Sequence, residues 1–229
     1  MKAIFWDIDN TLIDFVASSH EAFFELCKSH QLIVDEGHFQ RWYTFKEQFW
    51  RKQEQGQMNV EEIVAHQFDQ LRDETHFQGD IVAFSLEFQQ LLHHHAVPVM
   101  HAKETLSWCQ LQGFQQYAAS NGYIQQQTSR LTLCGLFPYF NALFVSDDIK
   151  AEKPSPTFFQ TALKYAHLNA EDVLMIGDNL ITDIQGAQSV GIKACWYNTH
   201  TSINNSPKNI QPDYEIHTLK ELETLAMCL

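Results

Sequence analysis

The sequence predicts an α/β protein with a doubly wound, mostly parallel sheet, interrupted near its start by an all-helical insert. From Val97 onward, short apolar strands alternate with helical patterns, which is typical of a parallel sheet covered by helices on both faces. From about Ser18 to Ala96, in contrast, apolar residues recur at helical spacing with no convincing strand. Polar clusters follow four of the strands, which is where ligands bind in such sheets.

The first strand is the apolar run from Ala3 to Trp6. Further strands are expected over residues 115–119, 142–145, 173–176 and 192–196, and near Tyr214. Helices are expected over residues 103–112, 124–134, 157–167 and 182–190, with a closing helix from Leu219 after a surface loop of residues 198–212. We therefore expect a sheet core of residues 1–16 and 97–229 and a helical insert of residues 17–96.

Composition excludes several classes of partner. The 229 residues are 45% apolar and 13% aromatic, which is enough for a sizeable core. The formal net charge of −13 argues against nucleic acid, whose phosphates require clustered Lys and Arg. No apolar run approaches the length of a membrane span, and the start lacks the regions of a signal peptide. We expect a soluble, cytoplasmic protein that binds neither nucleic acid nor membrane.

Two sets of metal-binding residue types have plain structural interpretations. The five cysteines lie far apart, without the paired spacing of zinc sites or disulfide frameworks, so we expect buried free thiols. These are Cys27, Cys109, Cys134, Cys195 and Cys228. The triplet from His93 to His95 would point in different directions on a helix, which indicates a solvated helix end rather than a metal site.

Two aspartates, Asp7 and Asp9, come directly after the first strand and are followed by Asn10 and Thr11. In an extended strand, side chains two residues apart share a face. The two carboxylates are therefore expected nearly side by side, unless the chain turns there. Because two carboxylates this close repel each other, one must be protonated or a cation must neutralise them. A bound Mg²⁺ would do this with oxygen ligands alone.

Polar residues also follow three later strands. Ser120 to Gly122 come after the second strand, and Lys153 lies in the loop after the third. Asp178 follows the fourth strand, and Asp183 comes five residues later, early in the next predicted helix. Because the carboxyl ends of parallel strands meet at one edge of the sheet, we expect these side chains to converge there with the two aspartates of the first strand.

The acidic residues suit phosphoryl transfer, which needs a positioned nucleophile, neutralised phosphate oxygens and a proton for the leaving group. Asp7 fits the nucleophile, because a carboxylate can form an aspartyl-phosphate that water later hydrolyses. Asp9 fits the general acid and then the base for water. Asp178 supplies a further carboxylate for Mg²⁺, and Asp183 joins it directly or through a water.

The remaining polar residues suit a phosphate group. The Ser120 hydroxyl and the amides around Asn121 and Gly122 lie at a strand-to-helix turn, where they can donate hydrogen bonds to phosphate oxygens. Lys153 adds a positive charge that offsets both the carboxylates and the phosphate. We therefore expect Ser120, Asn121 and Lys153 to bind the substrate.

Each signal has a structural interpretation when it is taken alone. An Asp-x-Asp after a strand is often a turn or a helix cap, and Ser-Asn-Gly is a common turn. Lys153 before Pro154 would suit an exposed loop, and Asp178 with Asp183 would suit a helix cap. The conjunction of all four clusters, in this order and at four strand ends, favours the functional interpretation.

Together these segments resemble the four motifs of the haloacid dehalogenase-like (HAD) phosphohydrolases. The matching residues are Asp7 to Thr11, Ser120, Lys153 with Pro154, and Gly177-Asp178 with Asp183. The resemblance covers nearly the whole chain and places the insert as that superfamily's cap of the first type. It implies that Asp7 is the nucleophile, that Asp9 is the acid/base with its backbone carbonyl on Mg²⁺, and that Asp178 is a metal ligand.

A narrower resemblance concerns the pyrimidine nucleoside 5'-monophosphatases. It lies in Val173 to Ala187 and Ala194 to Asn198, and in Trp50 and Gly56 of the insert. Asp9 distinguishes the chain from the dehalogenases, which do not keep the second aspartate, and from phosphonate hydrolases, which replace it with a small residue. Sugar-phosphate mutases keep both aspartates but usually follow them with Gly, whereas Asn10 follows them here.

We therefore expect a Mg²⁺-dependent phosphomonoester hydrolase that forms an aspartyl-phosphate and acts on nucleoside 5'-monophosphates. Two alternatives stay open: a sugar-phosphate phosphatase or phosphomutase, and a non-catalytic sensor of a phosphorylated ligand. Lys46 of the insert can donate to a base or a ribose, and nearby aromatic side chains either stack on a base or fill the helical core. These aromatic residues are Trp42, Tyr43, Phe45, Phe49 and Trp50.

Overall fold

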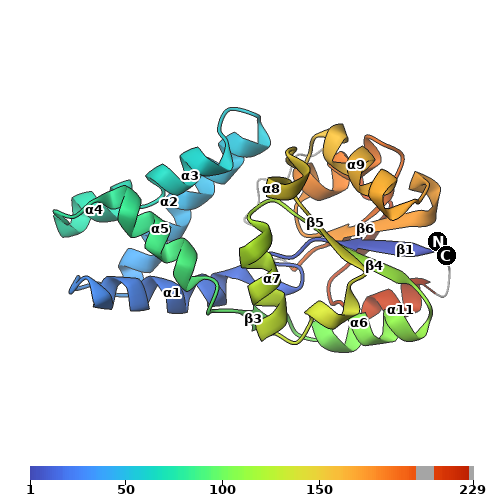
Figure 1. Ribbon diagram of the computed structural model, residues 1–229, viewed down its shortest axis with the longest axis horizontal. Helices are drawn as coiled ribbons and strands as arrows, with labels where there is room; N and C mark the ends of the chain where they lie inside the picture. The colour runs from blue at the N-terminus through green and yellow to red at the C-terminus, as the bar shows by residue number, and fades with distance from the viewer. Residues whose placement is uncertain (200–208, 227–229) are drawn as a thin grey trace. The chain divides into compact units, whose positions relative to one another are not determined.

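The computed structural model describes residues 1–199 and 209–226 (Figure 1). Its strands are β1 (Ala3–Trp6), β2 (Ile13–Asp14), β3 (Val97–Pro98), β4 (Gln115–Ser120), β5 (Ala142–Val145), β6 (Val173–Gly177), β7 (Lys193–Tyr197) and β8 (Tyr214–Ile216). Its α-helices are α1 (Phe15–Ser29), α2 (Glu36–Glu54), α3 (Val60–His66), α4 (Asp69–Thr75), α5 (Ile81–Leu91), α6 (Ala102–Leu111), α7 (Ile124–Leu133), α8 (Ser146–Ile149), α9 (Pro156–Ala166), α10 (Gly186–Gln188) and α11 (Glu221–Ala226). Three further helical turns are η1 (Phe137–Tyr139), η2 (Ala170–Asp172) and η3 (Leu180–Gln185).

Six strands form one sheet in the order β5-β4-β1-β6-β7-β8. Every neighbouring pair in this sheet is parallel. The chain starts in the middle of the sheet with β1, extends it on one side through β4 and β5, and then on the other through β6, β7 and β8. This is the predicted doubly wound α/β fold, which is confirmed.

The central strand β1 is apolar on both sides because helices cover both faces of the sheet. All four of its residues are buried. Ala3 and Phe5 belong to the same apolar cluster as Phe158 and Phe159 of α9. On the opposite face, the indole nitrogen of Trp6 donates to the side-chain oxygen of a buried glutamine in β4 at 3.1 Å. By the same alternation, Asp7 falls on the α9 side of the sheet.

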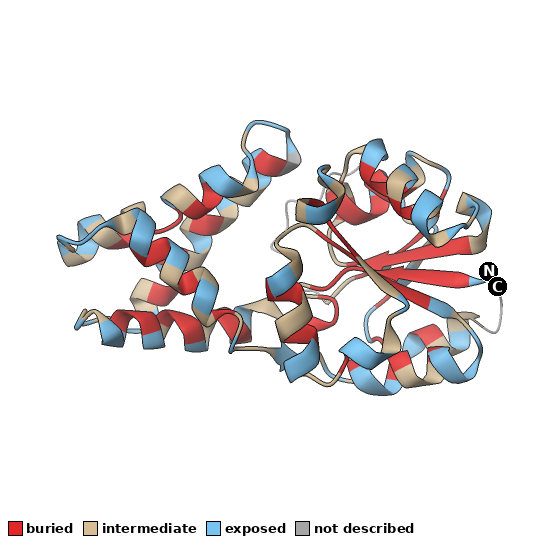
Figure 2. Ribbon diagram, in the orientation of Figure 1, coloured by how far each residue is buried: buried red, intermediate tan, exposed pale blue. Residues whose placement is uncertain are grey.

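The helices form a layer on each face of the sheet (Figure 1). α9 packs with α8 and α10 on one side, and α6 packs with α11 on the other. The strands between these layers are almost entirely buried (Figure 2). The carboxyl edge of the sheet is thus held by a rigid core on both faces.

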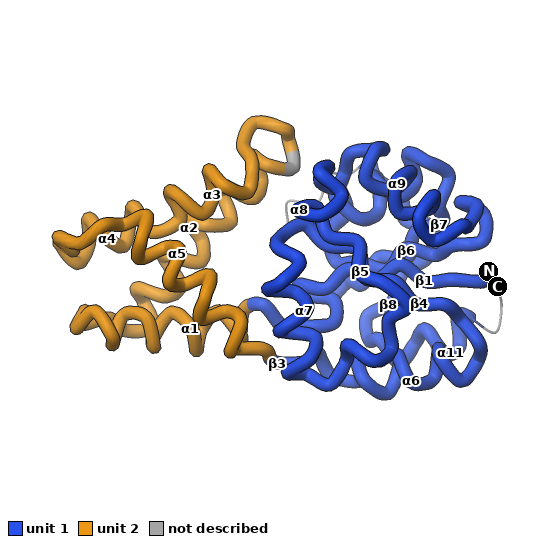
Figure 3. The backbone as a smooth tube through the Cα atoms, viewed as in Figure 1, with its two compact units in different colours: residues 1–15, 97–229 blue, residues 16–96 orange. Residues whose placement is uncertain are grey.

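The chain divides into two compact units, one of residues 1–15 and 97–229 and the other of residues 16–96 (Figure 3). These bounds fall within one residue of the predicted ones, whereas the role of the helical unit as a cap stays a prediction. The short antiparallel pair β2–β3 joins the two crossings between the units, with Ile13 opposite Pro98 and Asp14 opposite Val97. The sequence analysis did not predict this pair, because two-residue strands carry no detectable periodicity.

Aromatic side chains form the core of the helical unit. The rings of Trp42 and Phe68 stack with centroids 5.2 Å apart, and the Phe88 ring packs edge-on against both. Trp42 therefore fills the core. Lys46 is buried, and its ammonium nitrogen lies 4.7 Å from the centroid of the Tyr43 ring.

Several local predictions need correction or completion. The helix predicted over residues 182–190 is present over residues 180–188, as the π-helix η3 followed by α10. Asn179 caps its start and accepts the amides of Ile181 and Thr182. The histidine triplet follows the end of α5, and His95 pairs with Glu25 at 2.7 Å. Three cysteines are buried and free, whereas Cys134 is half-buried. Cys228 and residues 200–208 of the predicted loop lie outside the described residues.

Replacing Phe88 with Ala should destabilise the helical unit by about 3–5 kcal/mol, because the change removes buried apolar surface and leaves a cavity between Trp42 and Phe68. Urea unfolding measures the loss. Leu86 is the matched control, since it lies on the same helix and is 53% exposed. Its replacement with Ala should change the free energy of unfolding by about 0.5 kcal/mol or less. Equal losses in the two variants would contradict the packing described here.

Candidate active site

Polar side chains gather at the carboxyl edge of three neighbouring strands. Asp7 directly follows β1, Ser120 ends β4, and Asp178 directly follows β6. These strands are adjacent in the order β4-β1-β6, and the amide of Asp7 continues the ladder by donating to the carbonyl of Ile176 at 2.8 Å. Parallel pairing therefore brings together residues that lie more than a hundred positions apart in the sequence.

Three carboxylates form a compact cluster at this edge. Asp7, Asp178 and Asp183 each offer a carboxylate oxygen, and these oxygens all lie within 4.8 Å of one another. Gly177 permits the approach, because a Cβ atom at that position would overlap the Asp183 carboxylate. Hydrogen bonding fixes Asp183 further, since its second oxygen accepts the amide of Asn179 at 3.1 Å.

A buried lysine occupies the centre of the acidic edge. The Lys153 ammonium nitrogen lies 2.7 Å from Asp7 Oδ1 and 2.6 Å from Asp183 Oδ1, and it also donates to the carbonyl of Ala119 at 2.7 Å. The Asn121 side chain fixes the backbone at this position, because it accepts the Lys153 amide at 2.8 Å and donates to the Lys153 carbonyl at 2.9 Å. The Asn121 amide group thus lies on the loop of Lys153.

The proton affinities at this edge follow from burial and charge. Burial raises the pKa of the Asp7 carboxyl to about 7, although the neighbouring Lys153 lowers it. Burial, together with the charges of Asp7 and Asp183, raises the pKa of Asp178 well above its ordinary value. Burial opposes the charge on Lys153, but Asp183 and Asp7 more than offset it, so the pKa of Lys153 is raised and its ammonium stays charged. Two carboxyls thus compete for a cation or a proton.

The Asp9 carboxylate is not part of this cluster. The two aspartates were expected nearly side by side unless the chain turns there, and the chain does turn. The chain turns after Ile8, whose carbonyl accepts the amides of both Leu12 and Ile13 at 2.9 Å, and Asn10 adopts a φ of 62°. This turn ends the strand alternation before Asp9 is reached. The Asp9 carboxylate instead contacts α7, where it pairs with a buried arginine.

The residues on α7 that hold Asp9 were not predicted. Arg130 Nη1 lies 2.6 Å from Asp9 Oδ1, and Gln127 Nε2 lies 2.8 Å from Asp9 Oδ2. The same Gln127 nitrogen lies 3.0 Å from the hydroxyl oxygen of Ser120. The only available signal was their spacing of three residues on a predicted helix, which is equally typical of a solvated face.

Two further contacts surround the acidic cluster. The hydroxyl of Thr11 donates to Asp7 Oδ2 at 3.2 Å, so that both oxygens of Asp7 have a donor. The indole nitrogen of Trp196 donates to the backbone carbonyl of Asp178 at 2.8 Å and anchors the end of β6. Thr11 and Trp196 belong to the matching sequence segments, although their contacts could not be read from the sequence.

The charges of this edge fit a divalent cation. Four carboxylates lie there, those of Asp7, Asp9, Asp178 and Asp183, against two buried cations, Lys153 and Arg130. A net charge of about −2 therefore remains when all of these groups are ionised. The ligand atoms of the cluster are carboxylate oxygens, which magnesium prefers to nitrogen or sulfur.

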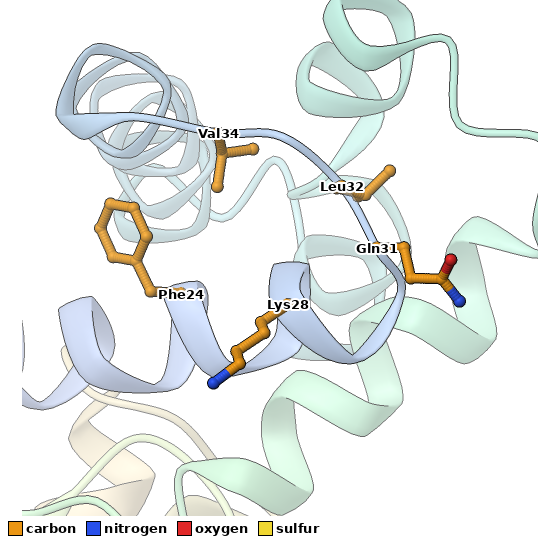
Figure 4. Close-up of a pocket in the computed structure, with 5 residues that line it drawn as sticks. All are labelled: Phe24, Lys28, Gln31, Leu32 and Val34. Carbon is orange, nitrogen blue, oxygen red and sulfur yellow. The ribbon is translucent and has the colours of Figure 1, made fainter.

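A separate hollow lies in the helical unit (Figure 4). It is lined by Phe24, Lys28, Gln31, Leu32 and Val34, and has a volume of about 380 Å³. Its lining is mostly apolar and includes none of the predicted site residues. The hollow therefore contributes none of the carboxylates of the acidic cluster.

Comparison with known proteins places the chain. The family model described as haloacid dehalogenase-like hydrolase matches residues 1–191. The chain belongs to this hydrolase family. The pyrimidine 5'-nucleotidase PynA of Streptococcus pneumoniae is 30% identical over 222 residues, which are 96% of this chain and 93% of that protein. The pyrimidine 5'-nucleotidase YjjG of Escherichia coli is 36% identical over 107 residues, which are 46% of this chain and 47% of that protein.

The same family relation appears in the solved structures. The HAD-hydrolase YfnB from Bacillus subtilis, bound to magnesium, has a TM-score of 0.91 at 30% identity and covers 98% of this chain and 97% of that chain. The predicted family and the prediction that the protein is an enzyme are therefore confirmed. The individual roles predicted for the site residues of this haloacid dehalogenase-like hydrolase stay predictions.

Magnesium should stabilise the protein more strongly at pH 8 than at pH 5.5. Because the pKa of Asp7 is raised to about 7, the folded state retains a proton on Asp7 between about pH 4 and pH 7 that the unfolded state has released, and the raised pKa of Asp178 acts in the same direction. The contribution of these groups to stability is therefore lost as the pH rises through that range. A Mg²⁺ ion held by these carboxylate oxygens would compete with the protons for them, so its binding would strengthen as the pH rises.

Thermal unfolding with Mg²⁺ and with a chelator, at both pH values, measures this difference. In the control variant Asp178→Asn, the increase in Tm with Mg²⁺ should be largely lost at both pH values. A magnesium effect of equal size at pH 5.5 and pH 8 in the wild type would contradict the competition.

Proposed function

We propose that this hydrolase is a Mg²⁺-dependent phosphatase of nucleoside 5'-monophosphates that forms an aspartyl-phosphate on Asp7. The observation that carries the proposal is the pairing of Asp7 with Lys153 inside the acidic cluster, at the carboxyl edge of the sheet. An aspartate held beside a cation is suited to approach a phosphate dianion, which the other carboxylates alone would repel.

The first chemical step is attack by a carboxylate oxygen of Asp7 on the phosphorus atom. A bond forms between that oxygen and phosphorus, and the bond between phosphorus and the ester oxygen breaks. Lys153 and Thr11 hold the two oxygens of Asp7 at 2.7 and 3.2 Å and thereby orient the carboxylate. The Lys153 charge also offsets the negative charge of the phosphate oxygens.

Asp9 serves the two proton transfers in this proposal. Asp9 takes up a proton from solvent as the ester binds, gives it to the departing 5'-oxygen of the nucleoside, and then takes one from the water that attacks the aspartyl-phosphate. Inorganic phosphate is released and Asp7 is regenerated as a carboxylate. Because the Asp9 carboxylate lies outside the acidic cluster, the groups assigned to nucleophilic attack and to proton transfer are separate.

The acidic cluster would hold Mg²⁺ through Asp7, Asp178 and the backbone carbonyl of Asp9, with Asp183 as a direct or water-mediated contact. Bound there, the ion would supply charge neutralisation for the phosphate oxygens. The magnesium named in the YfnB structure supports this assignment, as does the residual negative charge of the cluster.

Ser120 and Lys153 are the proposed phosphate contacts, together with the backbone amides around Asn121 and Gly122. Asn121 was also predicted to bind the substrate, but its side chain fastens the backbone of Lys153 at 2.8 and 2.9 Å. Its contribution in the proposed reaction is therefore to place the lysine, while its backbone amide remains a proposed donor to phosphate.

The substrate class rests on the relatives. PynA and YjjG are pyrimidine 5'-nucleotidases, and PynA matches nearly the whole chain, including the helical unit. A sugar-phosphate substrate remains the second candidate, since N-acylneuraminate-9-phosphatase of Mus musculus is 25% identical over 98% of this chain. We propose a cytoplasmic location; none of the described helices has the length and apolarity needed to cross a membrane.

A panel of monophosphates should therefore show faster phosphate release from uridine, cytidine and thymidine 5'-monophosphates than from purine or sugar phosphates. We expect kcat/KM to be at least about tenfold higher for the pyrimidines, equivalent to about 1.4 kcal/mol of transition-state binding. Faster release from sugar phosphates would overturn the proposed substrate class while leaving the phosphatase chemistry in place.

Replacing Asp7 with Asn should lower kcat by on the order of 10⁴-fold or more, because the amide cannot form the covalent intermediate. Mass spectrometry of acid-quenched wild-type protein should find a phosphoryl group on the peptide that contains Asp7, and a chelator should prevent its appearance. Turnover close to the wild-type rate in Asp7→Asn would refute the nucleophile assignment.

A further inference from the structure

We propose that Gln127 and Arg130 of α7 are positioning residues for Asp9, which hold its carboxylate outside the acidic cluster and connect it to the Ser120 hydroxyl. The inference rests on the proposed function, in which Asp9 protonates the leaving group. In this proposal, two side chains of α7 position both the proposed proton donor, Asp9, and a proposed phosphate contact, Ser120.

Arg130 forms a buried ion pair with Asp9. Its side chain has 0% exposure, and its Nη1 atom lies 2.6 Å from Asp9 Oδ1. The guanidinium remains ionised inside the protein and needs a countercharge. Within the described part of the chain, Asp9 is the only carboxylate that forms an ion pair with it. Its Nε and Nη2 atoms are buried and find no hydrogen-bond partner among the described residues, and its guanidinium carbon lies 5.5 Å from the centroid of the Phe15 ring.

Gln127 fixes the orientation of the Asp9 carboxylate by hydrogen bonding. Its side chain is buried, and its amide nitrogen donates to Asp9 Oδ2 at 2.8 Å and to the Ser120 hydroxyl at 3.0 Å. Its side-chain oxygen accepts from Arg130 at 3.1 Å. Each oxygen of the Asp9 carboxylate therefore has its own donor, which determines the plane of the group as well as its position.

Stability alone does not explain this arrangement. Replacing a buried ion pair with well-packed apolar side chains is often neutral or stabilising, and α7 already buries Leu131 beside Arg130. A buried arginine directed at one carboxylate, next to a hydroxyl at a strand end, is better explained by the placement of that carboxylate. The proposed reaction needs such placement, because proton transfer falls steeply with misalignment.

The consequence can be measured through the leaving group. A nucleoside 5'-oxygen is a poor leaving group and needs a proton as it departs, whereas p-nitrophenolate is stable without one. The ratio kcat/KM reports the steps up to departure of the leaving group. Loss of these contacts to Asp9 should therefore lower kcat/KM far more for the nucleotide than for the aryl phosphate, whereas a general structural defect would lower both alike.

The test compares Arg130→Met and Gln127→Met with the wild type on uridine 5'-monophosphate and p-nitrophenyl phosphate, both with saturating Mg²⁺. We expect kcat/KM to fall by at least about 30-fold for the nucleotide and by less than about fivefold for the aryl ester. Arg130→Lys should recover part of the loss, since it restores the charge. Gln125→Met is the matched control on the same helix, because Gln125 is exposed, and it should leave both rates unchanged.

Equal losses on the two substrates, or no loss on either, would overturn the inference. If Arg130→Met does not fold, Gln127→Met carries the same comparison. Should the wild type hydrolyse neither ester, the proposed function fails, and a double-mutant cycle on Tm then tests the placement of Asp9. Losses in Arg130→Met and Asp9→Asn that are far from additive would support it, and additive losses would overturn it.

Discussion

The active edge depends on one buried ammonium group. Lys153 donates to the carboxylates of Asp7 and Asp183 and to the carbonyl of Ala119, all at 2.6 to 2.7 Å. In a region of low polarity, the carboxylates of Asp7, Asp178 and Asp183 would otherwise repel one another strongly. Its three partners come from the ends of β1 and β4 and from η3, so the lysine connects neighbouring segments of the carboxyl edge. Its loss would leave two buried carboxylates without their principal countercharge.

Two cations form ion pairs with different acidic residues of this edge. Lys153 serves Asp7 and Asp183, and Arg130 serves Asp9. The division leaves Asp178 without an ion pair to a side chain among the described residues, while burial and the charges of Asp7 and Asp183 raise the pKa of its carboxyl. The residual negative charge suits a divalent ion. A count of charges would not reveal this, since the geometry and not the number of acids separates the proposed nucleophile Asp7 from the proposed proton donor Asp9.

The acidic edge and the aromatic core of the helical unit are built from separate parts of the chain. The acidic edge lies wholly within the sheet unit, whose strands and helices are buried on both faces and hold the side chains rigidly. The helical unit has its own aromatic core around Trp42 and Phe68. Such independence lets one hydrolytic core serve many esters, which agrees with the range of phosphatases named among the relatives, from nucleotidases to N-acylneuraminate-9-phosphatase.

The sequence alone determined the fold class, the helical insert and the family. Strand periodicity and the order of Asp7, Ser120, Lys153 and Asp178 sufficed, because parallel strands necessarily bring their carboxyl ends to one edge. Local turn geometry was beyond reach: the hydrogen bonds to the Ile8 carbonyl direct Asp9 away from Asp7, and alternation along a strand cannot foresee where a strand stops.

Only the tertiary structure decided which partners these residues have. Gln127 and Arg130 occupy ordinary positions in a polar helix, and their burial follows from packing that no local pattern encodes. The same holds for Asn121, whose side chain fastens the Lys153 loop 32 residues away. Sequence spacing specifies which side chains reach the edge of the sheet, whereas distances between segments remote in the chain specify which charge neutralises which, and those distances exist only in the folded protein.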